Sequence, residues 1–217
     1  AFVPVAKPWL VCALLPTCGA VYVSAELRTQ AGAVTSYATV SSVTGSPTVY
    51  DYTDGDGTWR AYEWLTAGSL TLSAPGDVEH LVVAGGGGAG GMSYIPGAGA
   101  GAGGLLRGTA YRSVGTYPVV VGLGGFGSYG SVAPEKGGNS TVFDLVAFGG
   151  GASDEATGSN RNGGSGAGRK AGASTGQGTG VAGQGFAGGG SLNGGGEGAA
   201  SGGGGAASVG LASVSRV

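Results

Sequence analysis

The residues most able to support chemistry are few in this sequence, and they lie far apart along the chain. The single histidine, His80, falls inside an apolar run with the character of a β-strand. Because there is no second histidine, we expect neither a His-based metal site nor a His-dependent catalytic triad. We predict a structural role for His80.

Two pairs of acidic residues are the next candidates for chemistry. Asp54-Gly-Asp-Gly57 contains the first acidic pair of a calcium-binding loop, but the loop's sixth-position glycine and twelfth-position glutamate are missing. We predict a turn over residues 51–57 instead. Asp154 and Glu155 are adjacent, so an extended chain directs them to opposite faces, and without a special turn they cannot act as a catalytic pair.

A run of glycines, Gly85-Gly-Gly-Gly-Ala-Gly-Gly91, follows a strand-like segment, as a dinucleotide-binding loop does. Such a loop must open a helix within a βαβ unit. The glycine-rich chain that follows excludes this helix. The sequence therefore predicts no catalytic residue, no cofactor and no metal ion, and we expect that the protein is not an enzyme.

The composition narrows the fold class. Glycine supplies 53 of the 217 residues, and charged residues make up only 10% of the chain, with a net charge of -2. This charge offers no basic surface for nucleic acid or an anionic membrane. Each glycine inside a helix costs roughly 1 kcal/mol relative to alanine, so we expect negligible α-helix. A hydrophobic fraction of 41% argues against charge-driven disorder.

Alternating polar and apolar residues predict an all-β fold. Residues 69–73 alternate in steps of two, and residues 58–65 place Trp59 and Arg60 on opposite faces of a strand. Further strands are expected at residues 34–43, 79–84, 105–111, 115–122, 140–148 and 207–217. Short strands separated by turns are typical of a small β-sandwich.

Three long glycine tracts connect or follow these strands, at residues 85–104, 122–130 and 149–205. The last tract is too long for an ordinary loop. It is either a flexible linker or an ordered structure, and its Asn, Ser and Thr interruptions favour order. Extended glycine chains can pack closely and pair their backbone groups because no Cβ separates them. We expect polyglycine-II helices packed in a bundle. The strict Gly-X-Y repeat of collagen is absent.

The N-terminal segment, residues 1–24, has one lysine and a short apolar run, so two interpretations are open. It is either a secretory signal or a retained segment that anchors the chain to neighbouring subunits, and its three prolines favour the second. The run is too short to cross a bilayer. The candidate anchor residues are Phe2, Trp9, Leu10, Leu14 and Leu15. Cys12 and Cys18 could form a disulfide, but free thiols are expected in a reducing cytosol.

Several motifs occur in a recognisable order after the aromatic strand. They are Gly68-Ser-Leu-Thr-Leu-Ser-Ala-Pro-Gly76, Leu81-Val-Val-Ala-Gly-Gly-Gly-Gly-Ala-Gly-Gly91, Gly103-Gly-Leu-Leu-Arg-Gly108, Thr116-Tyr-Pro-Val-Val-Val-Gly-Leu-Gly-Gly125 and Gly137-Gly-Asn-Ser-Thr141. Together they resemble the glycine-rich domain of bacteriophage minor tail proteins and tail-fibre tip adhesins. The resemblance covers residues 58–217.

This resemblance implies a structural protein of the virion with a host-adhesion role and packed polyglycine-II helices. We expect an N-terminal mounting region at residues 1–57 and a glycine-rich β domain at residues 58–217. The expected partners are other virion proteins, further copies of the chain and a host-surface receptor. The alternative is a purely architectural subunit, a capsid decoration or head fibre that binds no receptor.

Aromatic residues isolated among glycines are the candidate receptor contacts. A rigid ring loses little conformational entropy when it is ordered on binding. The candidates are Tyr94, Phe126, Tyr129 and Phe186. Each of them could instead fill a gap in the bundle.

Overall fold

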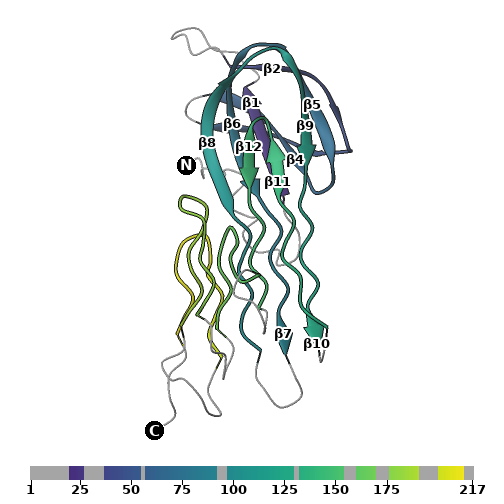
Figure 1. Cartoon of the computed structure of the whole chain (residues 1–217). Coiled ribbons are helices and arrows are strands. Elements are labelled where there is room, and N and C mark those ends of the chain that lie inside the picture. Colours follow the sequence, from purple (N-terminus) through teal and green to yellow (C-terminus); the bar gives the residue numbers. More distant parts are fainter. Residues whose placement is uncertain are drawn as a thin grey trace.

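A computed structural model gives the fold of the protein. It describes residues 20–26, 37–54, 57–91, 97–129, 132–153, 160–169, 176–190 and 200–212. The candidate anchors Phe2, Trp9, Leu10, Leu14 and Leu15, together with Cys12 and Cys18, lie outside these ranges. The described chain forms two facing β-sheets and, at one end of them, a bundle of extended glycine-rich segments (Figure 1). No helix occurs in these residues, so the all-β prediction is confirmed.

The first sheet has five antiparallel strands in the order β3-β4-β1-β6-β8. They are β1 (Ala20–Glu26), β3 (Thr48–Asp54), β4 (Gly57–Trp64), β6 (Gly76–Val83) and β8 (Leu105–Arg112). The earliest described strand, β1, lies at the centre. Its register places Val21 opposite Trp64 of β4 and Val82 of β6.

The second sheet also has five antiparallel strands, in the order β12-β11-β9-β5-β2. They are β2 (Thr39–Thr44), β5 (Gly68–Ala74), β9 (Gly115–Val120), β11 (Ser140–Val142) and β12 (Leu145–Ala147). Two short strands, β7 (Gly90–Gly91) and β10 (Ser128–Tyr129), pair in parallel at the far end of the bundle (Figure 1).

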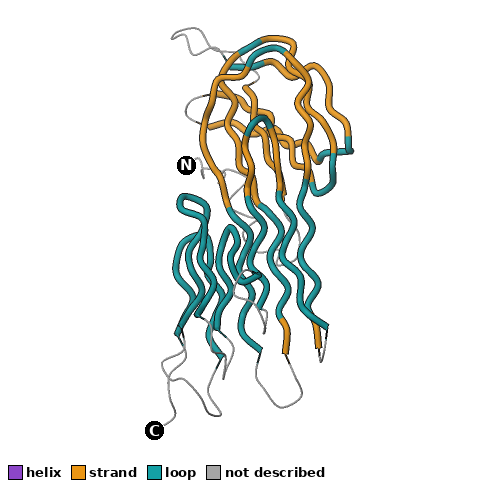
Figure 2. The backbone as a smooth tube through the Cα atoms, viewed as in Figure 1, coloured by secondary structure: helices purple, strands orange, loops and turns teal. Residues whose placement is uncertain are grey.

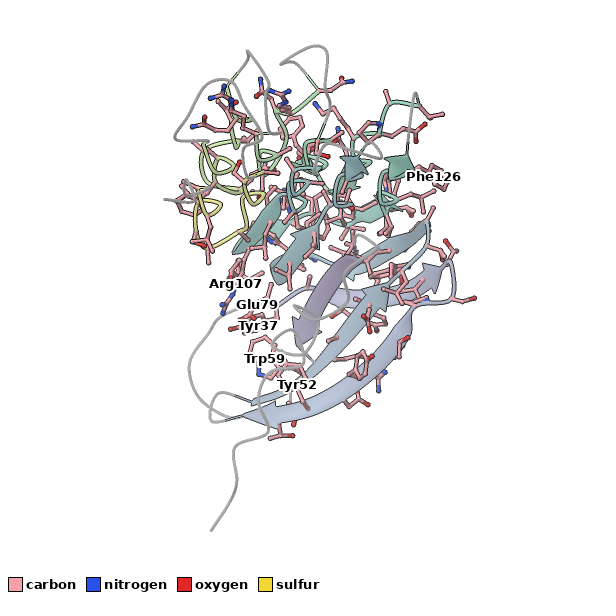
Figure 3. The ribbon with its side chains drawn as sticks, turned by 90° about the horizontal axis from the view of Figure 1, so that it is seen from below. Tyr37, Tyr52, Trp59, Glu79, Arg107 and Phe126 are labelled. Atoms are coloured by element: carbon pink, nitrogen blue, oxygen red, sulfur yellow. The ribbon has the colours of Figure 1, made fainter. Side chains whose placement is uncertain are left out.

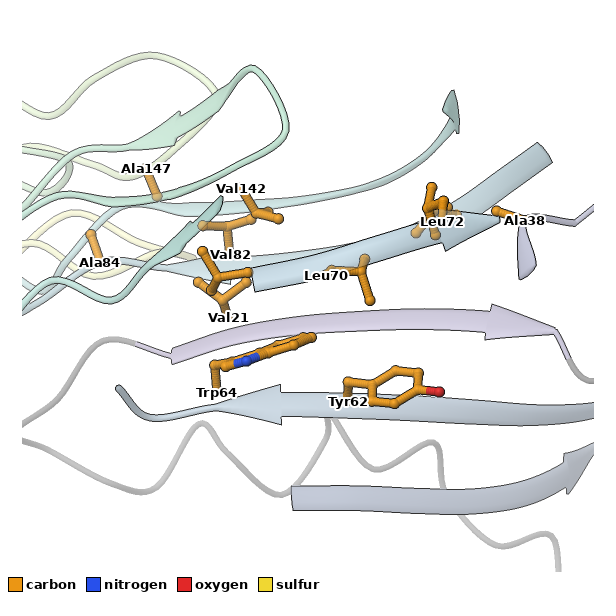
Figure 4. Close-up of a cluster of buried hydrophobic side chains, with 12 residues drawn as sticks. Val21, Ala38, Tyr62, Trp64, Leu70, Leu72, Val82, Ala84, Val142 and Ala147 are labelled. Carbon is orange, nitrogen blue, oxygen red and sulfur yellow. The ribbon is translucent and has the colours of Figure 1, made fainter. Parts of the chain in front are cut away.

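The hydrophobic core lies between the two five-stranded sheets (Figure 4). Leu70 and Leu72 of β5 are fully buried because alternation turns them inward and their polar neighbours outward. Trp64 is also fully buried, and its indole Nε1 donates a hydrogen bond to the Thr44 carbonyl oxygen at 2.8 Å. Val119 completes this layer from β9. The predicted sandwich is therefore confirmed.

Three local predictions were wrong. The strand expected at residues 140–148 is the hairpin of β11 and β12, because Phe143 adopts a φ of 56° and turns the chain. The turn expected at residues 51–57 does not begin at Asp51, since β3 continues to Asp54. Residues 207–212, where a final strand was expected, contain none, because they return along the bundle.

The expected boundary between residues 57 and 58 falls at the start of β4, in the β3–β4 hairpin. The strands before it, β1 and β3, pair with β4 in the first sheet, and β2 pairs with β5 in the second. A cut at this boundary would therefore remove hydrogen-bonding partners from both sheets. Experiments on this protein need the full chain.

The bundle segments hydrogen-bond to one another in steps of three residues. In segment 84–88, the amides of Ala84 and Gly87 donate to segment 101–104 at 3.0 and 2.9 Å. The amides of Gly85 and Gly88 donate to segment 135–138 at 3.0 and 2.8 Å. The carbonyls of Gly85 and Gly88 accept from segment 150–153 at 2.9 and 3.1 Å. A three-residue repeat with bonds radiating to several neighbours is the geometry of an extended left-handed helix with three residues per turn. Figure 2 shows these segments continuing directly from the strands.

The C-terminal tract continues the same network. Segment 166–169 donates at a three-residue step to segment 186–189, at 2.9 and 3.2 Å. Segment 186–189 in turn donates to segment 202–205, at 3.1 and 2.8 Å. Ala102 donates to Gly204 at 3.0 Å, which joins the tract to the earlier segments. The described part of residues 149–205 is therefore ordered, as expected for packed polyglycine-II helices.

Close approach of the backbones explains the glycine content. A Cβ on Gly149 would overlap the carbonyl group of Gly137, and a Cβ on Gly189 would overlap that of Leu211. Only glycine permits such contacts.

Gln184 joins the bundle to the sandwich. Its side-chain Oε1 accepts from the Phe148 amide at 2.9 Å, and its Nε2 donates to the Val146 carbonyl at 2.9 Å. Its own carbonyl accepts from the amide of Leu105, the first residue of β8, at 2.9 Å. These three bonds connect a turn of the bundle to two strands that lie in different sheets.

Candidate functional site

The predicted receptor contacts do not converge on one site. Phe126 lies on a lateral edge of the bundle and is 78% exposed (Figure 3). Phe186 is 44% exposed and belongs to a segment bonded to Gly205, far from Phe126 in the bundle. The backbone of Tyr129 lies in β10 at the far end of the bundle. Tyr94 lies outside the described residues.

The bundle has an inverted distribution of apolar side chains. Its buried apolar residues are alanines, such as Ala98, Ala152 and Ala167. Among the described residues, its largest apolar side chains are exposed: Leu123, Phe126, Val132, Phe148, Phe186, Val209 and Leu211. The glycine packing leaves no interior space for them, so they lie on the surface.

Two groups of these exposed residues mark opposite sides of the bundle. We define edge A as Leu123 and Phe126, which are 72% and 78% exposed, and edge B as Val209 and Leu211, which are 61% and 84% exposed. The segment of edge A leads into β10, whereas the segment of edge B is the yellow C-terminal part on the other side (Figures 1 and 3). Leu123, Val209 and Leu211 were not predicted from the sequence, because the predicted contacts were aromatic residues.

A separate aromatic cluster covers part of the outer face of the first sheet. Trp59 of β4 packs edge-on against Tyr37 at 4.8 Å between ring centroids, and stacks with Tyr52 of β3 at 6.4 Å. Trp59 and Tyr52 are buried. Arg60, on the opposite face as predicted, forms two hydrogen bonds to Asp51, at 2.7 and 2.8 Å. The Arg60 guanidinium lowers the pKa of the Asp51 carboxyl by this hydrogen bonding.

A small pocket lies between β6 and β8, farther along the first sheet (Figure 3). Its lining residues are Glu79, His80, Leu81, Arg107, Gly108 and Thr109. Glu79 and Arg107 supply opposite charges, and Thr109 supplies a hydroxyl. This combination can hydrogen-bond a small polar molecule, but the pocket's lining contains no nucleophile paired with a base in the way that covalent catalysis requires.

His80 lies on the strand face that also carries Val78 and Val82 of the core. Its Nδ1 is buried and has no hydrogen-bond partner in the described part of the chain. Burial lowers the pKa of His80, and the nearby charge of Arg112 lowers it further. The imidazole is therefore neutral at neutral pH, which fits the structural role predicted for it.

The buried imidazole predicts a loss of stability in mild acid. Below about pH 6.5 the unfolded chain binds a proton at His80 more readily than the folded chain does, so stability falls with pH in this window. We expect the melting temperature of the wild type to fall between about pH 7.5 and about pH 5.5. The fall should be smaller in a His80→Val variant. Equal falls in differential scanning calorimetry would contradict this account.

Arg161 is a buried residue that the sequence analysis did not single out. Its side chain is fully buried in the bundle and donates a hydrogen bond from an Nη atom to the Gly176 carbonyl at 2.7 Å. Its carbonyl accepts from the Ala167 amide at 2.8 Å. The Arg161 side chain thereby links its own segment to Gly176, and both belong to the bundle.

The described residues contain no group of three or more His, Cys, Asp or Glu side chains placed to hold a metal ion. No helix among them has the length and apolar character needed to cross a membrane.

The geometry defines an all-β protein in which a sandwich of two sheets continues into a hydrogen-bonded glycine bundle. A family model described as a glycine-rich domain matches residues 65–216, and the chain belongs to this family. Strands β1 to β4 precede the matched region, yet they complete its sheets. The comparisons with curated proteins and with solved structures found no match.

Proposed function

We propose that this chain is a non-enzymatic structural protein of a bacteriophage virion. Its place is the tail, as a minor tail or tail-fibre tip component, and its glycine bundle contacts the host surface. The family match supports a glycine-rich domain. The virion and tail roles are proposed from the resemblance of the motif order to phage tail proteins.

The observation that carries the adhesion role is the rigid bundle that extends from the sandwich. Hydrogen bonds at three-residue steps hold its segments together down to β7 and β10 at the far end (Figure 1). Binding residues are commonly presented by a rigid scaffold on chain segments at its end. The far end of the bundle, where Tyr129 lies, is the surface that meets the receptor, and the sandwich faces the particle.

Competition for host adsorption tests the adhesion role. The purified full chain should reduce adsorption of the phage to its propagation host. A Tyr129→Ala variant should compete at least about tenfold less well, as loss of a central aromatic contact costs roughly 2 kcal/mol. The matched control is Val114→Ala, an exposed residue of the sandwich. Equal competition by wild type and Tyr129→Ala would contradict a receptor contact at this end.

A reconstruction of intact particles distinguishes the tail component from the architectural alternative. We expect the chain at the tail tip, with its bundle directed away from the particle. Copies distributed over the head would favour a capsid decoration or head fibre, and would contradict the tail assignment.

A further inference from the structure

The two lateral edges of the bundle are incomplete compared with its interior. Interior segment 84–88 is hydrogen-bonded to four neighbouring segments. Within the described chain, edge segment 122–127 is bonded to segments 85–88 and 135–138 and, through the Gly122 amide, to the Ser140 hydroxyl. The segment of edge B is bonded there to Ala187 and to residues 202–205. A polyglycine-II packing can therefore continue outward at both edges.

The side chains on these edges are those expected at an interface. Leu123 and Phe126 of edge A are three residues apart, so a helix with three residues per turn stacks them in one row. Residues 122–129 carry no charge, and neither do residues 200–212 around edge B. Contiguous exposed apolar residues rimmed by polar surface mark interaction sites.

The surface of edge B offers a shape that suits the row on edge A. Beside Val209 and Leu211 lies segment 202–205, which consists of four glycines. A Cβ on Gly205 would meet nothing nearer than the Ser208 oxygen at 3.8 Å, so space remains beside this residue, at the end of the segment. Glycine segments without side chains form furrows into which large side chains can pack.

We infer that edge A of one molecule packs against edge B of a second copy of this chain. Leu123 and Phe126 lie one helical turn, or three residues, apart along their segment. A partner that contacts both side chains in the same way must have the same spacing along its own helix axis. The opposite edge of the same protein presents that spacing. Segments inside one bundle already run in both directions, so two bundles can lie side by side with their far ends pointing the same way.

The contact is heterologous, because two different surfaces meet. Such contacts close into a ring when the rotation between copies allows it. A ring of this kind places several far ends next to one another. The inference does not depend on the proposed function, since it concerns the sides of the bundle.

Sedimentation velocity of the full chain tests this inference. Two double variants each remove one edge: Leu123→Ser with Phe126→Ser, and Val209→Ser with Leu211→Ser. The wild type should associate as concentration rises. Each variant should associate at least about tenfold more weakly, as expected when well-packed anchor residues are lost. Tyr111→Ser, an exposed change on the sandwich, should behave as the wild type does.

A mixture of the two edge variants gives the sharpest outcome. Each retains the edge that the other lacks, so the mixture should form a one-to-one dimer that neither variant forms alone. Association of either variant at the wild-type strength would overturn the inference, and so would a monomeric wild type or a monomeric mixture. Single Leu123→Ala and Leu211→Ala variants, checked by circular dichroism, give the same test with smaller changes if a double variant unfolds.

Discussion

Replacing Gly149 with alanine is expected to destabilise the protein by about 3 kcal/mol or more. The new Cβ would occupy the position of the Gly137 carbonyl group, and backbone atoms cannot move aside as a flexible side chain can. Separating the two segments would also break the bond between the Gly149 amide and the Asn139 Oδ1, which is 2.9 Å long. Chemical denaturation of the full chain, followed by circular dichroism, measures this loss.

The matched control for this substitution is Gly86→Ala in the same bundle. A Cβ on Gly86 has no neighbour nearer than the Gly101 oxygen at 3.8 Å. Alanine also reduces the freedom of the unfolded chain, so Gly86→Ala should be neutral or stabilising by up to about 1 kcal/mol. Similar losses in both variants would mean that glycine is not required by close packing.

Replacing Trp64 with alanine should cost about 3–5 kcal/mol, because it leaves a large cavity in the core. The indole is fully buried between the sheets, stacks with Tyr62 at 6.0 Å between centroids and lies directly over Gly68. The loss also leaves the Thr44 carbonyl without its indole donor. Urea denaturation of wild type and variant gives the difference in the free energy of unfolding.

Two further variants separate the contributions of Trp64. Trp64→Phe keeps an aromatic ring but removes the N–H donor, and should cost about 1–3 kcal/mol. Leu65→Ala, at the exposed next residue, should change stability by about 0.5 kcal/mol or less. A loss at Trp64→Ala no larger than that at Leu65→Ala would place Trp64 outside the core.

The strands with clear alternation could be predicted from the sequence, and the irregular ones could not. Leu70 and Leu72 alternate with polar residues, and β5 lies where that pattern places it. Asp144 is only a weak turn signal, and the positive φ falls on Phe143, where it depends on the packing around the ring and not on the residue type. β1 was hidden in a segment whose composition also fits a secretory signal.

The bundle could be predicted as a class of structure, but its surface could not. Glycine content and the absence of a collagen repeat indicated packed extended chains. Which side chains face outward depends on which segments become neighbours, and these contacts join residues far apart in sequence. Phe126 was identified because aromatic residues draw attention among glycines, whereas Leu123 and Leu211 are equally exposed and were missed.

Hydrogen exchange across the glycine tracts tests most directly whether the bundle is ordered. The amides of Gly150, Gly164, Gly189 and Gly204 each donate at 2.8 or 2.9 Å to a carbonyl in another segment. We expect them to be protected to an extent that approaches that of Val82 in the core of the sandwich. Exchange of these four amides at the rate of an unstructured chain, with Val82 still protected, would contradict an ordered bundle.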